Sequence, residues 1–141
     1  MIGPTFVSAA TAERVAAWFG VDAEEIQRRF RYNVVFDGVE AFAEDRLYGG
    51  HFQVGDVVVD AINPCQRCVV PSRDSRTGAQ DTGFQKRFME LREAELPADA
   101  RRAQFTHFYR LTANTRIAAS EAGKQIHLGD VVLLNFPPAG L

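Results

Sequence analysis

The sequence contains few cysteines. It has neither a marked excess of positive or negative charge nor a long apolar run. The 141 residues contain 2 cysteines, and the formal net charge is −2. A chain without a basic excess is not expected to bind nucleic acid or a membrane surface. No apolar stretch is long enough to span a membrane, and residues 1–20 lack the basic start and apolar centre of a signal peptide. We therefore expect a cytoplasmic protein whose thiols stay reduced.

Length and composition indicate one compact folding unit. With 141 residues, 46% of them hydrophobic, the chain can bury a core of its own. We expect a single domain over residues 1–141, with a helical segment at 8–30 and a polar tail at 135–141.

Both cysteines lie in one C-x-x-C motif, within Asn63-Pro64-Cys65-Gln66-Arg67-Cys68. A thioredoxin-like site would place the first thiol at the start of a helix, but the valines after Cys68 and then Pro71 indicate a strand. A structural zinc site needs four ligands, and the 3 histidines are scattered along the chain. Three interpretations remain, which are a single thiolate ligand to a metal, a sulfur-carrying nucleophile, and two inert cysteines.

Further segments accompany this motif in a characteristic order. They are Phe30-Arg31-Tyr32-Asn33-Val34-Val35, Phe42-Ala43-Glu44-Asp45, Thr77-Gly78 and Ile126-x-x-Gly129-Asp130-Val131-Val132-Leu133. Together with the C-x-R-C segment they resemble a MOSC domain, the module found at the C-terminus of molybdenum cofactor sulfurases and in the amidoxime-reducing component family. The resemblance extends from about Pro4 to Leu134.

The resemblance implies a molybdenum cofactor site. By family position Cys68 is the metal ligand, with Cys65 as the other thiol of the catalytic site, and Arg31 and Asn33 fall where cofactor-binding residues lie. We expect Arg31 and Cys68 to share a cleft at the end of the strand over 66–70. Family enzymes of that kind carry an additional N-terminal barrel region, in place of which this chain has about thirty residues.

Arginines and carboxylates near the motifs complete the predicted site. The planar guanidinium suits phosphate and carboxylate groups, and the arginines close to the thiols are Arg31, Arg67 and Arg73. Glu44 and Asp45 could orient a cofactor or serve as acid and base. The alternative is a turn cap or an ion pair, and for Asp45 we prefer this structural role.

Local signals predict helices first and strands afterwards. Gly20 fits a helix end, and Asp22 with Glu25 resembles a capping box. Helices are expected at 11–19, 22–30 and 84–95, strands at 33–36, 56–62, 66–70, 105–112 and 126–135, and a turn or long hairpin tip at 114–123. The repeated Gly-Asp-Val-Val at 55–58 and 129–132 predicts two tight turns that lead into strands.

This order of elements predicts a mainly β fold with α decorations, in the α+β class. A small closed or partly open MOSC-type β-barrel fits it, because closure removes exposed strand edges. Any edge that stays open would need a partner, so a homodimer or a separate subunit is expected.

Two functions of different classes follow. One is a domain that binds the molybdenum cofactor through Cys68 and reduces N-hydroxylated substrates with electrons from a redox partner. The other is a sulfur carrier, in which a persulfide on Cys65 or Cys68 is supplied by a cysteine desulfurase of the pyridoxal phosphate-linked sulfurase family. A non-catalytic barrel is a third interpretation.

Overall fold

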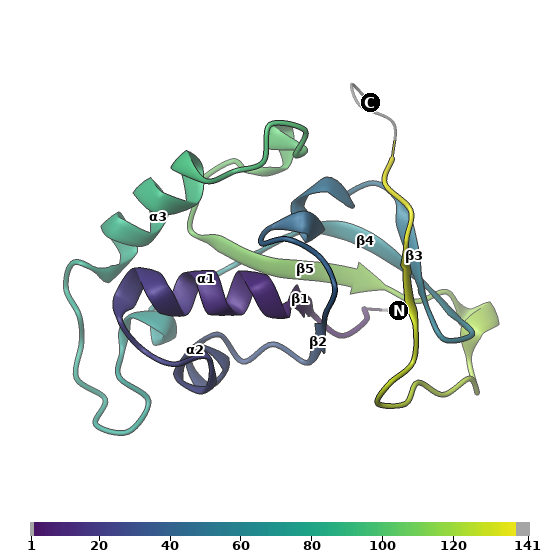
Figure 1. The fold of residues 1–141 in the computed structure, drawn as a ribbon, viewed down its shortest axis with the longest axis horizontal. Coiled ribbons are helices and arrows are strands. Elements are labelled where there is room, and N and C mark those ends of the chain that lie inside the picture. Colours follow the sequence, from purple (N-terminus) through teal and green to yellow (C-terminus); the bar gives the residue numbers. More distant parts are fainter. Residues whose placement is uncertain (1, 138–141) are drawn as a thin grey trace.

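The computed structural model describes residues 2–137 (Figure 1). In chain order the elements are β1 (Phe6–Ser8), α1 (Ala9–Phe19), α2 (Ala23–Phe30), β2 (Val34–Phe36), β3 (His51–Val54), β4 (Val57–Gln66), α3 (Phe84–Ala94), β5 (Arg110–Arg116) and β6 (Val132–Leu134). Short 3-10 helices cover Ala43–Arg46, Val70–Ser72, Arg102–Gln104 and Ala119–Glu121.

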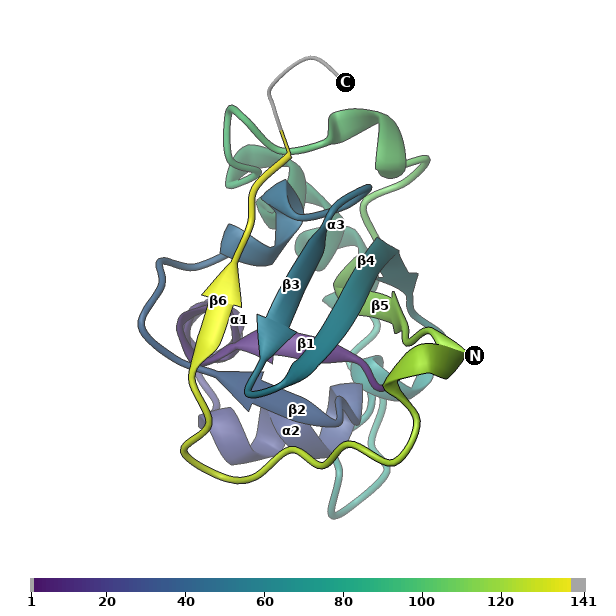
Figure 2. The ribbon, with the colours of Figure 1, turned by 90° about the vertical axis from the view of Figure 1, so that its right-hand side faces the viewer.

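The strands form one mixed, strongly curved sheet of six strands, nearly closed into a barrel (Figure 2). The strand order is β2-β1-β5-β4-β3-β6, so β2 and β6 are the two edges. The pair β1 and β2 is parallel, and the other neighbouring strands run antiparallel. The predicted α+β class and partly open barrel are therefore confirmed.

The end of α1 and the start of α2 lie where the sequence signals placed them, whereas α1 begins at Ala9, two residues before the predicted start at 11. Ser8 caps α1, accepting a hydrogen bond from the Thr11 amide at 3.1 Å, and Gly20 ends that helix with φ 64°. Asp22 caps α2 by accepting from the Glu25 amide at 2.7 Å. These capping interactions satisfy backbone donors that would otherwise be unpaired, which explains why local sequence sufficed.

Two buried apolar clusters hold the layers together. The first joins the helices to the sheet and includes Val15, Phe30 and Phe88, all fully buried. The second fills the barrel, where the Phe6 and Phe52 rings meet edge to face with centroids 5.0 Å apart. Figure 1 shows the corresponding division, with the helices gathered beside one end of the sheet.

A buried ion pair lies where these clusters meet. Arg92 on α3 donates to both carboxylate oxygens of Asp45, at 2.6 and 2.8 Å. Its guanidinium lies over the rings of Phe42, from the first cluster, and Phe105, from the second, at 4.6 and 5.0 Å. Arg92 Nε also donates to the Arg110 carbonyl on β5 at 3.0 Å. One side chain thus connects α3, the Phe42–Asp45 segment and the sheet.

The strand prediction around the cysteines was wrong in its bounds. A break was expected after residue 62 and a new strand at 66–70, but β4 continues through Pro64 to Gln66. Register irregularities on both sides of Pro64 absorb the missing amide, as proline in a sheet requires. Residues 67–69 leave the strand, and Pro71 lies in the 3-10 helix Val70–Ser72, where its fixed φ is favourable.

The predicted strand at 105–112 was placed too early. The strand β5 begins at Arg110 and continues to Arg116, through residues expected to form a turn. Asn114 was interpreted as a turn residue, but its side-chain amide donates to Asn63 Oδ1 on the neighbouring strand at 2.9 Å. Pairing with another strand therefore outweighed the local turn preference.

The C-terminal strand is shorter than predicted. A turn occupies the start of the range, because Gly129 has φ 89° and the Asp130 carboxylate accepts from the His127 amide at 2.8 Å. Only Val132–Leu134 pairs with β3. Of the predicted tail at 135–141, residues 138–141 lie outside the described part of the chain.

We expect Arg92→Met to destabilise the fold by about 3–5 kcal/mol, because it leaves the buried Asp45 charge without its partner. Urea unfolding monitored through Trp18, whose ring stacks on Phe42 at 5.5 Å, measures this change. Arg102→Met is the matched control, since its ion pair with Glu93 is exposed and worth less than about 1 kcal/mol. Equal losses in the two variants would contradict a central role for the buried pair.

Candidate functional site

The two thiols occupy different environments at the end of β4. Cys65 is half-buried within the strand, whereas Cys68 is exposed beyond its end, and both are free. Arg67 Nη1 lies 3.2 Å from the Cys65 sulfur. The guanidinium is thus close enough to donate a hydrogen bond to the Cys65 sulfur.

Arg67 joins the thiol segment to the end of α2. Its Nη2 donates to the Phe30 carbonyl, and its guanidinium lies over the Phe30 ring at 5.2 Å. Residues 37 positions apart are thereby brought together. Arg31, the next residue, ends α2 with φ 53° and has an exposed side chain. The F-R-x-N and C-x-R-C motifs are therefore neighbours in space.

A β-bulge lies opposite Cys65. In the pairing of β4 with β5, Pro64 faces Ala113 and Gln66 faces Arg110, so two β5 residues, Leu111 and Thr112, oppose the single residue Cys65. Thr112 has φ 74°, which is unusual for a β-branched residue. Bulges of this kind often lie next to functional sites, where they redirect a side chain.

Sequence reasoning missed Arg110 and Tyr109, which contact the thiol segment, and His107, which contacts Tyr109. Arg110 donates to the Pro64 carbonyl at 3.0 Å, and Tyr109 accepts from the Arg67 amide through its carbonyl at 3.1 Å. His107 Nδ1 accepts from the Tyr109 amide at 3.2 Å, and burial, followed by the charge of Arg110, lowers the pKa of this histidine. The polar and aromatic run at 106–110 was a usable signal, but it was interpreted only as strand.

Asn33 and Arg73 have local structural contacts. Asn33 Oδ1 accepts from the Thr5 amide at 2.8 Å, which aligns the starts of β1 and β2. Arg73 Nη1 donates to the Gly78 carbonyl at 3.0 Å and closes the loop after the thiols. Their roles as cofactor contacts stay predictions.

The loop over 73–80 is also attached to α2. Ser75 donates to Glu25 through its amide at 3.0 Å and through its hydroxyl, and Arg29 Nε donates to the same carboxylate at 2.6 Å. Burial alone would raise the pKa of Glu25, but these hydrogen bonds lower it to about 2. The downstream loop is therefore held against the helix that precedes Arg31.

Glu44 and Asp45 both lie in the core. Both carboxylate oxygens of Asp45 accept hydrogen bonds from Arg92, as the preferred structural role implies. The assignment of Asp45 as a cofactor contact stays a prediction. Glu44 is 1% exposed, and neither of its oxygens has a hydrogen-bond partner within residues 2–137. The nearby Thr11 hydroxyl is already engaged by Ser8 and the Phe42 amide. Burial and the charge of Asp45 raise the pKa of Glu44 to about 7.

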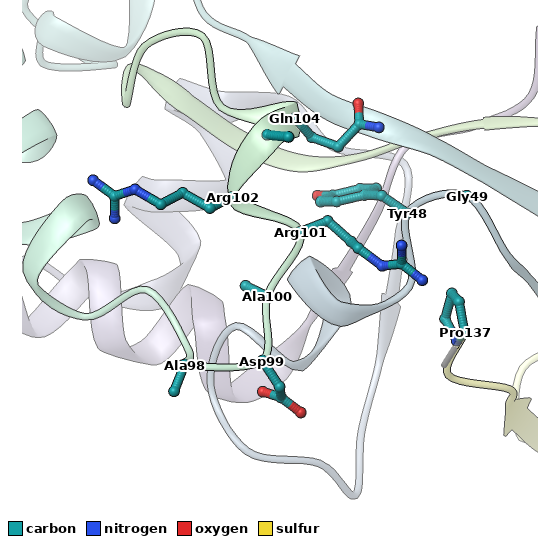
Figure 3. Close-up of a pocket in the computed structure, with 10 residues that line it drawn as sticks. Tyr48, Gly49, Ala98, Asp99, Ala100, Arg101, Arg102, Gln104 and Pro137 are labelled. Atoms are coloured by element: carbon teal, nitrogen blue, oxygen red, sulfur yellow. The ribbon is translucent and has the colours of Figure 1, made fainter. Parts of the chain in front are cut away.

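Two cavities in the described part of the chain lie away from the thiols. One, of about 610 Å³, is lined by Tyr48, Gly49, Pro137 and residues 98–104, with the Tyr48 ring, Arg101 and Gln104 around it (Figure 3). The other, of about 420 Å³, lies near His51 and Arg116. Neither includes Cys65, Cys68 or Arg31, so the predicted shared cleft is not one of them.

The donor groups limit how a metal could be held. Within residues 2–137 no group of three or more histidine, cysteine or carboxylate side chains is arranged to bind a metal ion. The soft, accessible donor is the Cys68 thiol. It could contribute one ligand to a metal that brings its other ligands with it.

Comparison with known families agrees with this architecture. A sequence model of the MOSC domain matches residues 5–132, nearly the whole chain. The chain therefore belongs to the MOSC domain family, which is associated with molybdenum cofactor sulfurase-type proteins. The resemblance drawn from the motifs is confirmed. A search of curated proteins finds no match. Among the helices in the described part of the chain, none is long and apolar enough to cross a membrane.

Glu44 should make stability fall as pH rises. In the unfolded chain its proton leaves near pH 4.5, and in the folded chain near pH 7. The folded state binds the proton more tightly, so this contribution is fully present below pH 4.5 and is lost as pH rises to about 7. The free energy of unfolding should fall by roughly 3 kcal/mol over this range, since one pKa unit corresponds to about 1.4 kcal/mol.

Glu44→Gln should remove this decline, as measured by urea unfolding at a series of pH values. Glu25→Gln is the comparison variant. Because the pKa of Glu25 is lowered, the contribution of this residue to stability is lost at acid pH and not on approach to neutral pH. A Glu44→Gln profile that runs parallel to wild type between pH 4.5 and 7 would contradict the raised pKa of Glu44.

Proposed function

We propose that this chain binds the molybdenum cofactor and that the Cys68 thiolate is the protein ligand to the metal. The observation that carries the proposal is the position of Cys68, an exposed thiol at the end of β4. Arg67, the residue before it, ties this position to the end of α2, where Arg31 is exposed. Membership of the MOSC domain family supports the same assignment.

The residues present fit such a group. A thiolate is a soft ligand that suits a thiophilic metal, and one protein ligand does not require a cluster of donors. The Arg31 side chain makes no hydrogen bond or ion pair with other residues in the range 2–137, so its planar guanidinium is free to bind a phosphate or carboxylate. Arg67 holds the thiol segment in place through its hydrogen bond to the Phe30 carbonyl.

When bound, the cofactor would supply oxygen-atom transfer, and the reaction we propose is the reduction of an N-hydroxylated substrate with electrons from a separate redox partner. The chain's own residues would position Cys68 and keep the thiol segment on the sheet. A cytoplasmic location belongs to this proposal, because both thiols must stay reduced.

Exposure of the thiol favours a second candidate, a sulfur carrier. Val69 and Val70 beside Cys68 are 52% and 42% exposed, and an accessible thiol with apolar neighbours suits contact with another protein. The Cys68 thiolate would attack the outer sulfur of a persulfide on a cysteine desulfurase. A sulfur–sulfur bond to Cys68 forms, the bond in the donor persulfide breaks, and the donor thiolate leaves.

A homodimer remains part of the proposal on structural grounds. The edge strands β2 and β6 carry exposed Val35 and Leu133, and open edges invite pairing with another chain.

We expect Cys68→Ser to abolish loading of molybdenum or sulfane sulfur and to leave the fold intact, because serine is similar in size but is a hard and poorly ionised ligand. Cys65→Ser is the matched control and should be milder, since Cys65 lies within the strand and contacts Arg67. Elemental analysis and cyanide-labile sulfur, measured on protein from a molybdenum-replete host, check both variants.

The two functions give different results in this experiment. Stoichiometric molybdenum in wild type supports cofactor binding, whereas labile sulfur without metal supports the carrier. Equal loss in both variants would contradict a special role for Cys68 and indicate a two-thiol mechanism. Wild-type protein that takes up neither would overturn both functions.

A further inference from the structure

Tyr109 carries a buried hydroxyl without a partner. Its side chain is 4% exposed, and its ring packs edge-on against Phe88 with centroids 5.6 Å apart. Within residues 2–137 the hydroxyl makes no hydrogen bond. Burying such a group is unfavourable, so each case in a folded protein calls for an explanation, which can be a functional role or a bound group.

The backbone places Tyr109 beside the thiols. The Arg67 amide donates to the Tyr109 carbonyl at 3.1 Å, so Tyr109 lies opposite the residue that precedes Cys68. Electrostatics agree, because burial and then the Cys68 charge raise the pKa of Tyr109 to about 12, against the opposing charge of Arg67. The hydroxyl therefore keeps its proton at neutral pH and is available as a donor.

Arg67 brings a second donor to the same place. Its Nη1 and Nη2 donate to Cys65 and to the Phe30 carbonyl, while its Nε is buried and has no partner in the described part of the chain. The Arg67 guanidinium lies over the Phe30 ring, and the Phe30 and Tyr109 rings both pack against Phe88, so Arg67 and Tyr109 border the same cluster. Two unused donors beside an accessible thiol suit an acceptor that carries negative charge.

We propose that Tyr109 is a positioning residue whose hydroxyl donates a hydrogen bond to an anionic group carried on the Cys68 sulfur. The terminal sulfur of a persulfide is the simplest such group. This inference rests on the proposed function of Cys68 as the residue that accepts a metal or sulfur, and it adds the residue that would hold the accepted group.

Sodium polysulfide is a probe that needs no metal. The Cys68 thiolate attacks a sulfane sulfur of the polysulfide, a sulfur–sulfur bond to Cys68 forms, and one bond inside the polysulfide breaks. The polysulfide, shorter by one sulfur, leaves with the electron pair. Charge and sulfur balance, and no other oxidant is required.

The test compares Tyr109→Phe with wild type on the full chain, at a polysulfide concentration that half-loads wild type. Alkylation followed by peptide mass spectrometry gives the ratio of persulfide to thiol at Cys68. This ratio should fall about tenfold in Tyr109→Phe, as expected for the loss of one hydrogen bond to a charged group. The unloaded variant should melt at or above the wild-type temperature, because the lost hydroxyl had no partner.

Tyr48→Phe is the matched control, since Tyr48 is equally buried but belongs to the barrel cluster and donates towards Asp45. Its persulfide ratio should equal that of wild type. An unchanged ratio in Tyr109→Phe, or an equal fall in both variants, would overturn the role of Tyr109 alone. Wild-type protein that forms no persulfide on Cys68 would overturn this role and the carrier function together, while leaving molybdenum loading as a separate measurement.

Discussion

Arg92 is wholly buried, and its charge is compatible with the core because Asp45 is buried against it. Both partners are fixed beyond the pair itself. Phe42 and Phe105 lie against the guanidinium from the two apolar clusters, and the Arg110 carbonyl accepts from its Nε. This pair therefore connects the helical layer to the barrel, and neither could shift there without breaking a buried hydrogen bond.

The same pair gives the two adjacent carboxylates different surroundings. Asp45 accepts hydrogen bonds from Nη1 and Nη2 of Arg92, whereas Glu44 is equally buried but has no donor of its own, and burial and the charge of Asp45 raise its pKa. If Glu44 were also ionised, two carboxylates would share the single Arg92 cation. Ionisation of Glu44 is therefore shifted to higher pH than for an exposed glutamate. The F-A-E-D segment thus combines a carboxylate paired with Arg92 and a buried carboxyl with a raised pKa.

Features that depend on neighbours in the chain could be predicted from the sequence. Gly20 marked the end of α1, Asp22 marked the start of α2, and the motif segments identified the family. Features that depend on distant partners could not. Local preference misplaced β5, because Asn114 is paired with Asn63 across the sheet. Arg92 gave no motif signal, because its importance comes from burial beside residues far away in sequence.

A continuous set of contacts leads from the core pair to the thiols. Asp45 holds Arg92, Arg92 donates to the Arg110 carbonyl, and the Arg110 side chain donates to the Pro64 carbonyl next to Cys65. This connection fixes β5 at the bulge opposite Cys65, where the positive φ of Thr112 costs about 1–3 kcal/mol. Such strain persists only where surrounding contacts impose it. The carboxylate motif and the thiol motif therefore act as one structural unit, in which the buried ion pair maintains the backbone geometry that leaves Cys65 half-buried and Cys68 exposed.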